Sequence, residues 1–450
     1  MTRGLDENRS VWVAETDVPR PTQKLTGRIV SDIAIVGGGF TGVSTAWHLR
    51  QRSPGLGIVL LEASTLGGGA SGRNGGQVLN WINGVTPQTP EATRRIHGAT
   101  RAGIDLAETL ATRYAPPGTF RRQGCLEVFT HPRRAEAGQQ HAESLNAAGI
   151  PAEFLPASAL RVEGAYGAIL DPLAGRLNGF ALLQALRAPL VESGVGVYEH
   201  TPVRRVQDGA EIVLETPEGE VRTRALVLAT NAYTPALGFF RRGILPLHSH
   251  VLATAPLPEK DWAGMGWGAW DGFTDDLDRI AYACRTPGGR LLFGGGGNPA
   301  YVYRFGGAPV GAGANEGSST FGAAATRESD RATRFMRAAL TRYFPTLAEV
   351  PVAHRWSGTL AITLDRVCSM GVGGANRNIY HALGYSGHGI ALALLAGRVL
   401  ADLYEGNHEA WRDLPFYQKR LLPLPPEPLR WLGYQAYTRL TGRSPRRRAG

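Results

Sequence analysis

Residues 32–62 constrain the fold more than any other stretch, because they read as a strand, a glycine turn, a helix and a second strand. An apolar run at 32–36 stops at Gly-Gly-Gly-Phe-Thr-Gly, residues 37–42, and a second apolar run at 58–61 ends on Glu62. This order is typical of dinucleotide-binding folds, in which glycines allow a tight turn and bring the backbone close to a pyrophosphate. The helix that follows presents unpaired N–H groups and the positive end of its dipole to the phosphates.

The acid after the second strand narrows the choice of dinucleotide. A carboxylate at Glu62 can accept hydrogen bonds from both hydroxyls of an adenosine ribose, whereas it would repel a 2′-phosphate. The glycine pattern alone is weak, since glycine makes up 59 of the 450 residues. Both flanking strands and the acid stand in register, so a glycine-rich loop without a ligand is the poorer interpretation. The sequence therefore predicts a dinucleotide site that does not take NADP.

Two further glycine-rich segments have no evident use in a nicotinamide enzyme. Residues 67–77 (GGGASGRNGGQ) follow the ribose acid, and residues 384–389 (GYSGHG) connect an apolar strand to an amphipathic helix over 390–403. Small residues permit close backbone approach to a planar ring that stays bound, and the second helix N-terminus is another place where partial positive charge can meet an anion. For 67–77 the alternative is a flexible surface loop.

Bulk properties exclude several classes of protein. A chain of 450 residues with 43% hydrophobic residues is long enough for two domains with buried cores. No apolar run approaches the ~20 residues of a membrane span, and residues 1–28 show no signal peptide. Cys125, Cys284 and Cys368 are too scattered for a disulfide framework or a zinc site, so we expect no metal and a cytoplasmic location.

The net charge of +10 does not by itself indicate nucleic-acid binding. Basic residues are dispersed, and the densest cluster, 443–448, is at the extreme C-terminus, where a solvated tail is the favoured interpretation. We therefore expect no nucleic-acid partner.

Periodicity and turn residues predict the remaining elements. Strands are expected at 124–129, 196–198, 279–282, 290–295 and 378–383, and a β-meander of 211–215 and 220–224 is expected to lead into an apolar strand at 225–229. Residues 243–356 are expected to be strand-rich, with long antiparallel strands that wall a pocket. Helices are expected at 90–114, 136–149, from Asn178 up to a disturbance at Pro189, at 327–344 and through 431–440. Residues 306–325 are expected to be a mobile insertion, and Val11-Trp12-Val13 to pack on the body of the protein.

The three glycine segments together resemble the FAD-dependent D-amino-acid oxidase, glycine oxidase and sarcosine oxidase superfamily. The matching residues are 35–42, 69–76 and 384–389. Within this superfamily, residues 356–363 (WSGTLAIT) are similar to gamma-glutamylputrescine oxidoreductases, and residues 425–430 (PPEPLR) are similar to aminophosphonate oxidoreductases. The resemblance covers roughly residues 10–435; it is specific for the superfamily and not for the substrate.

The resemblance implies one FAD and oxidation of an amine C–N bond to an imine, which water hydrolyses. The ADP half would be held by the 37–42 turn and Glu62, the pyrophosphate and ring by the 70–77 loop and Thr230, the adenine by the backbone of Val203, and the pyrimidine end of the flavin by 387–390. The predicted FAD contacts are Gly37, Gly39, Phe40, Thr41, Gly42, Glu62, Ala70, Ser71, Arg73, Asn74, Gly75, Gly76, Gln77, Val203, Thr230, Gly387, His388, Gly389 and Ile390. The predicted catalytic residues are His388, Tyr282, Trp356 and Tyr385, with Trp267 as a further wall residue.

Departures from the family pattern bear on the substrate. Glycine oxidases carry an arginine a few residues after Trp-x-Gly that clamps the substrate carboxylate, and residues 358–363 contain none. We therefore expect an amine whose anionic group, if any, lies farther from the reacting carbon. Arg279, Arg285 and Arg290 are candidates to receive it, and at most one of the three is expected to reach the pocket. Cys368 lacks the surroundings of a flavin-attaching cysteine, so a packing role and non-covalent FAD are expected.

The interpretation is an α/β protein with a Rossmann-like FAD-binding domain and a discontinuous antiparallel-sheet substrate domain. The predicted FAD-binding domain comprises 1–115, 170–242 and 355–410, the substrate domain 116–169 and 243–354, and a helical extension with a basic tail 411–450. The predicted activity is hydride transfer from a primary or secondary amine to flavin N5, with reoxidation by oxygen or another acceptor. The alternative is a flavoprotein of the same fold with an assembly or modification role, and a simple NAD dehydrogenase is less favoured because two glycine loops would be idle.

Overall fold

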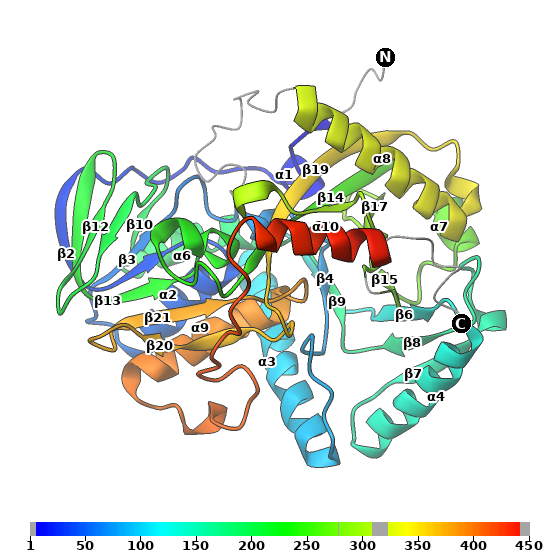
Figure 1. Ribbon diagram of the computed structural model, residues 1–450, viewed down its shortest axis with the longest axis horizontal. Helices are drawn as coiled ribbons and strands as arrows, with labels where there is room; N and C mark the ends of the chain where they lie inside the picture. Colours follow the sequence, from blue (N-terminus) through cyan, green and yellow to red (C-terminus); the bar gives the residue numbers. More distant parts are fainter. Residues whose placement is uncertain (1–5, 278, 308–322, 442–450) are drawn as a thin grey trace.

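The computed structural model describes residues 6–277, 279–307 and 323–441, in which two large sheets lie on opposite sides of the molecule (Figure 1). One sheet has eight strands in the order β10-β3-β2-β13-β12-β11, with β21 beside β13 and β20 beside β21. The other has ten, in the order β1-β19-β14-β17-β16-β15-β6-β8-β7, with β18 beside β14. A third, three-stranded sheet has the order β4 (Gln77–Val78), β9 (Gly175–Leu177) and β5 (Phe120–Arg121). The predicted α/β fold class is confirmed.

The eight-stranded sheet is parallel at its centre, where β2 lies between β3 and β13, and β21 follows β13. These four strands, β2, β3, β13 and β21, carry apolar runs because both faces of the sheet are covered. Helices cover one face, and the meander formed by β11, β12 and the first half of β13 covers the other. Ile33 and Ile35 of β2 point into the cluster formed with the helices, whereas Ala34 and Val36 pack against the meander. The strands of this sheet are β2 (Gly27–Val36), β3 (Ile58–Leu61), β10 (Gly196–Tyr198), β11 (Arg205–Gln207), β12 (Ile212–Glu215), β13 (Gly219–Leu228), β20 (Ser369–Gly373) and β21 (Ile379–Leu383).

The helices of this half are α2 (Phe40–Arg52), α3 (Pro90–Tyr114), α5 (Gly179–Ala185), α6 (Arg187–Glu192) and α9 (Ile390–Glu405). α2 and α9 pack closely: a Cβ added at Gly397 would stand 2.2 Å from Ser44 Oγ, and that hydroxyl donates to the Leu394 carbonyl at 2.6 Å. The break between α5 and α6 precedes Pro189, which lies in the first turn of α6. The short α1 (Val11–Ala14) buries Trp12 completely, as expected for the segment Val11-Trp12-Val13.

The ten-stranded sheet is mainly antiparallel and carries the second core. Its strands are β1 (Asp6–Glu7), β6 (Cys125–Phe129), β7 (Glu153–Pro156), β8 (Gly167–Asp171), β14 (Leu245–Pro256), β15 (Gly272–Asp275), β16 (Ala281–Arg285), β17 (Arg290–Gly295), β18 (Tyr301–Val302) and β19 (Val352–Ile362). α4 (Pro132–Ala147), α7 (Glu259–Gly264) and α8 (Ala323–Tyr343) pack on it. α4 begins four residues earlier than predicted, because His131 caps it and Pro132 occupies its first turn.

Three tryptophans of this half form the core rather than the pocket wall. Trp262 lies in α7, and its ring is 5.2 Å from that of Trp267, which in turn lies 4.5 Å from Trp270. Trp267 also stacks on Phe344 at 5.5 Å. The expectation that Trp267 walls the pocket is therefore wrong, because this apolar cluster buries the ring beneath α8.

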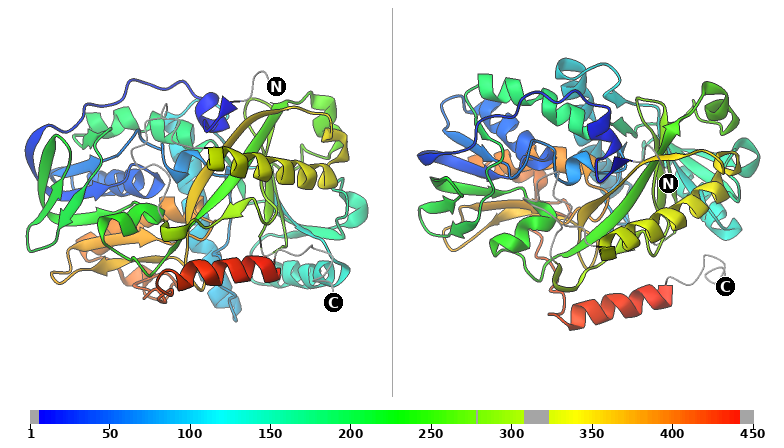
Figure 2. Two further views of the ribbon diagram at one scale, coloured as in Figure 1. Left: turned by 45° about the horizontal axis from the view of Figure 1, so that its top comes forward. Right: turned by 90° about the horizontal axis from the view of Figure 1, so that it is seen from above.

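The last described helix, α10 (Leu429–Thr441), lies on the outside of the molecule (Figure 2). Tyr434 donates to the Tyr301 carbonyl at 3.1 Å, and the Tyr303 hydroxyl donates to the carboxylate of Glu427. α10 is thus fastened to the segment beside β18, although 120 residues or more separate the partners in sequence.

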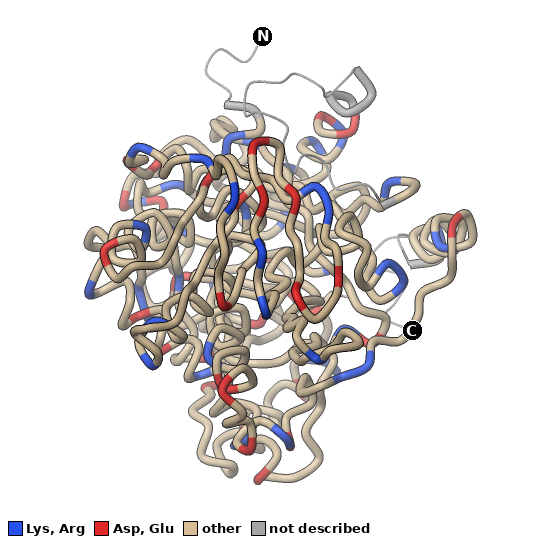
Figure 3. Tube along the Cα trace, turned by 90° about the vertical axis from the view of Figure 1, so that its left-hand side faces the viewer, with Lys and Arg blue, Asp and Glu red and all other residues tan. Residues whose placement is uncertain are grey.

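The sheets divide the chain somewhat differently from the predicted domain boundaries. The boundary predicted at 354/355 falls within β19, and the boundary at 169/170 falls within β8. Most of the expected insertion at 306–325 and the basic cluster at 443–448 lie outside the described residues. In the part of the chain that is described, no helix is long and apolar enough to cross a membrane. On the face shown in Figure 3, Lys and Arg are interspersed with Asp and Glu.

Candidate functional site

A cavity of about 1240 Å³ lies where the carboxyl ends of the parallel strands meet β14 and β19. Its lining comes from all three glycine segments, from residues 201–204, 229–233 and 236–237, and from the two long antiparallel strands β14 and β19. Ligands of open parallel sheets bind in this position, at the carboxyl ends of the strands. α10 contributes the far wall through Leu429, Gly433, Tyr434 and Tyr437.

In the turn at residues 37–42, close backbone packing requires glycine at two positions. Gly37 has φ +109°, and a Cβ there would stand 2.7 Å from the Ala229 carbonyl oxygen. A Cβ on Gly42 would stand 1.9 Å from the Gly37 carbonyl oxygen, so Gly42 brings α2 against the turn, as predicted. Ser71 Oγ accepts the Phe40 N–H at 3.1 Å. The N–H groups of Thr41 and Gly42, in the first turn of α2, have no partner within the helix.

Glu62 is fixed beside this turn. Its Oε2 accepts the Gly38 N–H at 2.6 Å, and its Oε1 accepts the Ser64 N–H at 2.8 Å. Burial raises the pKa of the carboxyl, and the two backbone N–H groups act in the opposite direction. Each oxygen can accept further hydrogen bonds, and Glu62 lines the cavity.

The 67–77 loop is held in place by its own side chains and by Trp12 of α1. Asn74 donates to the Ser71 carbonyl at 2.7 Å and accepts the Gly76 N–H at 2.9 Å. Trp12 Nε1 donates to the Asn74 carbonyl at 2.8 Å. Gln77 Nε2 donates to the carbonyls of Phe273 and Ala283, both at 2.7 Å, which ties the loop to β15 and β16.

The turn at 384–389 is built differently. A Cβ on Gly387, which has φ +94°, would meet nothing within 4 Å. His388 stands beside Trp81, with ring centroids 5.0 Å apart, and its buried Nδ1 has no hydrogen-bond partner among the described residues. Burial lowers the pKa of His388 to about 4, although the Ser386 backbone acts in the opposite direction, and the charge of Arg366 lowers it further, so the ring is neutral at pH 7. The Tyr385 hydroxyl is engaged with Thr41 Oγ1 at 2.6 Å.

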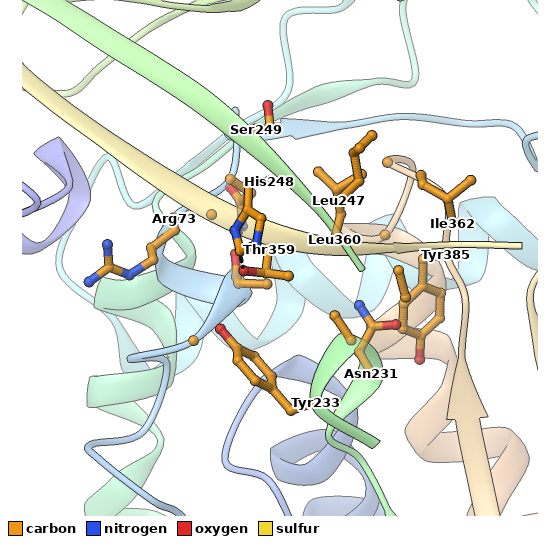
Figure 4. Close-up of a pocket in the computed structure, with 18 of the residues that line it drawn as sticks. Arg73, Asn231, Tyr233, Leu247, His248, Ser249, Thr359, Leu360, Ile362 and Tyr385 are labelled. Atoms are coloured by element: carbon orange, nitrogen blue, oxygen red, sulfur yellow. Dashed lines mark hydrogen bonds between the residues drawn. The ribbon is translucent and has the colours of Figure 1, made fainter. Parts of the chain in front are cut away.

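The two faces of the β14–β19 pair have different chemistry (Figure 4). Register places Leu247 opposite Leu360 and His248 opposite Thr359, so the two pairs point to opposite faces. His248 Nδ1 and Thr359 Oγ1 are 3.2 Å apart, on the face that Figure 4 shows toward Tyr233. Leu360 and Ile362 line the cavity with hydrocarbon side chains, within the 358–363 segment that contains no arginine.

Tyr282 lies over the 67–77 loop. Its ring would be 2.7 Å from a Cβ on Gly75, and its hydroxyl is 3.4 Å from Ser249 Oγ. Burial raises the pKa of Tyr282 to about 12, so the phenol stays protonated at neutral pH. Tyr282 is thus a neutral donor in the cavity wall.

The structure brings most of the predicted site residues to one cavity. Seventeen of the nineteen predicted FAD contacts line it; Gly42 and Gly76 lie behind the backbone, where Gly76 makes room for Trp12. Tyr282, Tyr385 and His388 line the cavity as well. Trp356 is not among the lining residues: its ring is buried with Trp12 and Val251, and its Nε1 donates to the Arg73 carbonyl at 3.0 Å.

Several lining residues escaped the sequence analysis. They are Asn231, Tyr233, Leu247, His248, Ser249, Thr359 and Tyr434. Asn231, whose side-chain oxygen accepts the Gly384 N–H at 3.0 Å, directly follows the predicted Thr230 and could have been found from the polar end of β13. The others sit on strands or a helix whose facing partners are set by tertiary pairing, so no local signal identifies them.

The cavity fits an FAD. At one end it has Glu62 and the N-terminus of α2, where the N-cap residue Gly39 has no side chain and Ser71 Oγ accepts only the Phe40 N–H. At the other it has a turn with open space at Gly387, an orphaned His388 Nδ1 and the N-terminus of α9, which no side chain caps. Cys368 is absent from the lining and sits in the core of the parallel half, and burial raises the pKa of its thiol to about 12. Its predicted packing role agrees with this position.

Comparison with known proteins supports the same cofactor. The model of the DAO family, described as FAD dependent oxidoreductase, matches residues 32–403. Gamma-glutamylputrescine oxidoreductase of Escherichia coli (strain K12) is 30% identical over 430 residues, covering 92% of this chain and 93% of that protein. Glycine oxidase of Geobacillus kaustophilus (strain HTA426) is 25% identical, over 86% and 96% of the two chains. The crystal structure of glycine oxidase from Geobacillus kaustophilus superposes with a TM-score of 0.69 at 23% identity, covering 88% of this chain and all of that one.

Proposed function

This chain belongs to the DAO family of FAD-dependent oxidoreductases, and on that premise we propose that it oxidises the C–N bond of a primary or secondary amine to an imine. Water then hydrolyses the imine, and oxygen or another acceptor takes the electrons. The observation that carries the proposal is one cavity lined both by the glycine turn at 37–42 with Glu62 and by the apolar side chains of Leu247, Leu360 and Ile362. The relatives named for gamma-glutamylputrescine and glycine oxidation support an amine as the donor.

The residues proposed to hold FAD divide by the part of the cofactor they meet. Glu62 would bind the ribose hydroxyls, the α2 N-terminus and Thr230 the pyrophosphate, and Val203 the adenine through its backbone. Gly387, His388 and the α9 N-terminus would meet the pyrimidine end of the flavin, where the dipole stabilises negative charge. FAD, when bound, supplies the hydride acceptor.

The protein's part in the reaction is to place a neutral amine and to keep water away from it. Hydride transfer needs the α-hydrogen at ~3–3.5 Å from the acceptor atom. Leu247, Leu360 and Ile362 can enclose the alkyl part of the amine, and Tyr282 with its protonated phenol can orient the nitrogen.

The described lining offers no free carboxylate to act as a general base. Glu62 is its single Asp or Glu, and that carboxylate lies at the ribose end. His388 has a pKa of about 4, too low for it to compete for a proton with an alkylammonium ion. The amine must therefore arrive in its neutral form, so kcat/KM should rise with pH until the substrate nitrogen is deprotonated.

An anaerobic screen tests the proposal. Purified protein is mixed with amines, amino acids and aminophosphonates, and flavin bleaching is followed without added NADH. We expect bleaching by at least one amine. A yellow protein that no amine bleaches would favour the alternative, a flavoprotein of this fold with an assembly or modification role.

The cofactor is expected to be tight but non-covalent. Acid precipitation of the protein should release all the flavin into the supernatant, because Cys368 lies outside the cavity and the 67–77 loop contains no histidine. Flavin that stays with the precipitate would contradict this. The cytoplasmic location and the physiological electron acceptor stay predictions.

A further inference from the structure

Arg279 is the one of the three candidate arginines that reaches the cavity. It precedes β16 in the loop from β15, and its guanidinium carbon lies 5.2 Å from the Tyr437 ring centroid and 5.9 Å from that of Tyr434. Its Nη1 and Nη2 are buried and have no hydrogen-bond partner among the described residues. Two unpaired nitrogens of a buried guanidinium are costly unless a ligand supplies acceptors.

The other two arginines are engaged elsewhere. Arg285 forms an ion pair with Glu259 and lies 4.7 Å above the Trp262 ring. Arg290 lies 3.4 Å from the Glu15 carboxylate and donates to the Thr254 carbonyl at 3.1 Å. Neither lines the cavity.

Arg279 also differs from the other arginines around the cavity. Arg73 donates to the carbonyls of Asn8 and Ser357, and Arg430 donates to those of Pro425 and Arg241. The remaining three, Arg9, Arg204 and Arg366, are exposed to solvent. Among the six described arginines that line the cavity, only Arg279 has a buried guanidinium group whose two Nη atoms have no hydrogen-bond partner among the described residues.

The position of Arg279 separates it from the nucleotide end. Tyr282, three residues later, covers Gly75 of the 67–77 loop, whereas Arg279 contacts α10. The Tyr301 hydroxyl donates to the Ile280 carbonyl at 3.1 Å, and the Tyr434 hydroxyl donates to the Tyr301 carbonyl at the same distance. These contacts fix the loop that carries Arg279 against α10.

We propose that Arg279, set between Tyr434 and Tyr437 of α10, binds a carboxylate or phosphonate at the end of the substrate farthest from the reacting amine. This inference rests on the proposed function and names its substrate class: an amine with a terminal anion, not a diamine or polyamine. The described lining has no carboxylate besides Glu62 to receive a second ammonium, whereas the fork of Arg279 matches the paired oxygens of a carboxylate or phosphonate.

Binding of unreactive anions provides a test that does not depend on turnover. Butanoate, pentanoate and propylphosphonate are titrated into FAD-loaded protein, with perturbation of the flavin spectrum or isothermal calorimetry as the signal. Arg279→Met should weaken binding of at least one of these anions roughly ten- to hundredfold. Arg279→Lys should retain part of the affinity, because it keeps the charge and loses the fork. Arg285→Met is the matched control, and its affinity should equal that of the unaltered protein.

Steady-state kinetics with substrate pairs provides the second test. Amino carboxylates of three to six carbons and 2-aminoethylphosphonate are each compared with the alkylamine of the same length. The unaltered protein should prefer the anionic member in kcat/KM, mainly through KM, and Arg279→Met should abolish that preference. Comparison of the carboxylates with the phosphonate shows which anion the subsite takes.

The outcomes separate the two proposals. Anion affinity that is the same in Arg279→Met and Arg285→Met overturns the Arg279 subsite, whether or not amines are oxidised. Anion binding that requires Arg279 in a protein that no amine bleaches would leave the subsite standing and overturn the proposed oxidation. A preference for neutral alkylamines or diamines over the amino acids also contradicts the subsite.

Discussion

Two glycine turns precede helices at the same edge of the parallel sheet, and glycine is needed in them for different reasons. The turn between β2 and α2 is closed by packing: side chains added at Gly37 or Gly42 would collide with backbone carbonyls. The turn between β21 and α9 is open at Gly387, where an added Cβ meets nothing within 4 Å, although a Cβ on Gly384 would stand 2.5 Å from Thr363 Cγ2. Thr41 and Tyr385 join the two turns through a 2.6 Å hydrogen bond.

The comparison shows that glycine has two different roles in these turns. In the first turn, glycine lets a helix and a strand approach each other, so its loss damages the fold. In the second, glycine leaves room for something that is not protein, so its loss damages binding while the fold survives. Variants can separate these two roles.

Gly42→Val should have the largest effect. A Cβ 1.9 Å from the Gly37 carbonyl oxygen forces α2 away from β2, and we expect a loss of more than about 4 kcal/mol of stability or no folded protein. Thermal unfolding followed by circular dichroism measures it. Gly55→Val, in the loop after α2 with nothing within 4 Å of the added Cβ, is the control. A Gly42→Val protein that melts like this control would show that the first turn is not limited by packing.

Gly387→Val should abolish FAD retention and leave a folded protein. The left-handed φ of +94° costs about 1–2 kcal/mol, and the added side chain enters the cavity. Flavin absorbance per protein and the melting temperature are the two measurements. Gly406→Val, at the other end of α9 with φ +80° and open space, carries the same backbone strain away from the cavity. Normal flavin content in Gly387→Val would remove this turn from the cofactor site.

The second turn also contains a titratable group, which gives a pH effect of intermediate size. Since the pKa of His388 is about 4 in the folded protein and near 6.5 in the unfolded chain, the unfolded state binds more protons between these values. Stability is therefore lost as the pH falls from about 6.5 toward 4.

His388→Gln should reduce this loss by about 1–3 kcal/mol, measured by urea unfolding at pH 7 and pH 4.5. His48→Gln should act similarly, since the pKa of His48 in α2 is also about 4. Only the His388 variant should change the flavin spectrum. An unchanged acid sensitivity in His388→Gln would mean that the ring is not held neutral.

Ser71→Ala should have the smallest effect. The hydroxyl accepts the first free N–H of α2, and its loss should cost about 1 kcal/mol. Thr89→Ala removes the N-cap hydroxyl of α3, which accepts the Ala92 N–H at 3.2 Å, and should cost a similar amount. Only Ser71→Ala should weaken FAD binding in a titration of the apoprotein. Equal FAD affinities would place the Ser71 cap outside the cofactor site.

Sequence predicted what depends on neighbours in the chain. The β2–α2–β3 unit with Glu62, the 90–114 helix and the 384–389 turn are local patterns, and each appears in the structure within a few residues of its predicted bounds. The substrate wall was predicted less well, because strand pairing decides which side chains face inward. Trp267 and Trp356 are aromatic residues from the strand-rich region, and register or loop packing directs both into cores. Tyr434 and Tyr437 meet Arg279 across more than 150 residues of sequence, which no periodicity reveals.

The strand order of the parallel sheet has a consequence for how the protein is made. The ribosome releases β2, α2 and Glu62 early, yet β13, which pairs with β2, follows much later, and β21 completes the edge with residues 379–383. Until then the nascent chain has half of a cofactor site. FAD stabilises only a state that binds it, so we expect the cofactor to protect nearly finished chains. A translation product that stops before β21 would have an intact first turn and no means of retaining the flavin.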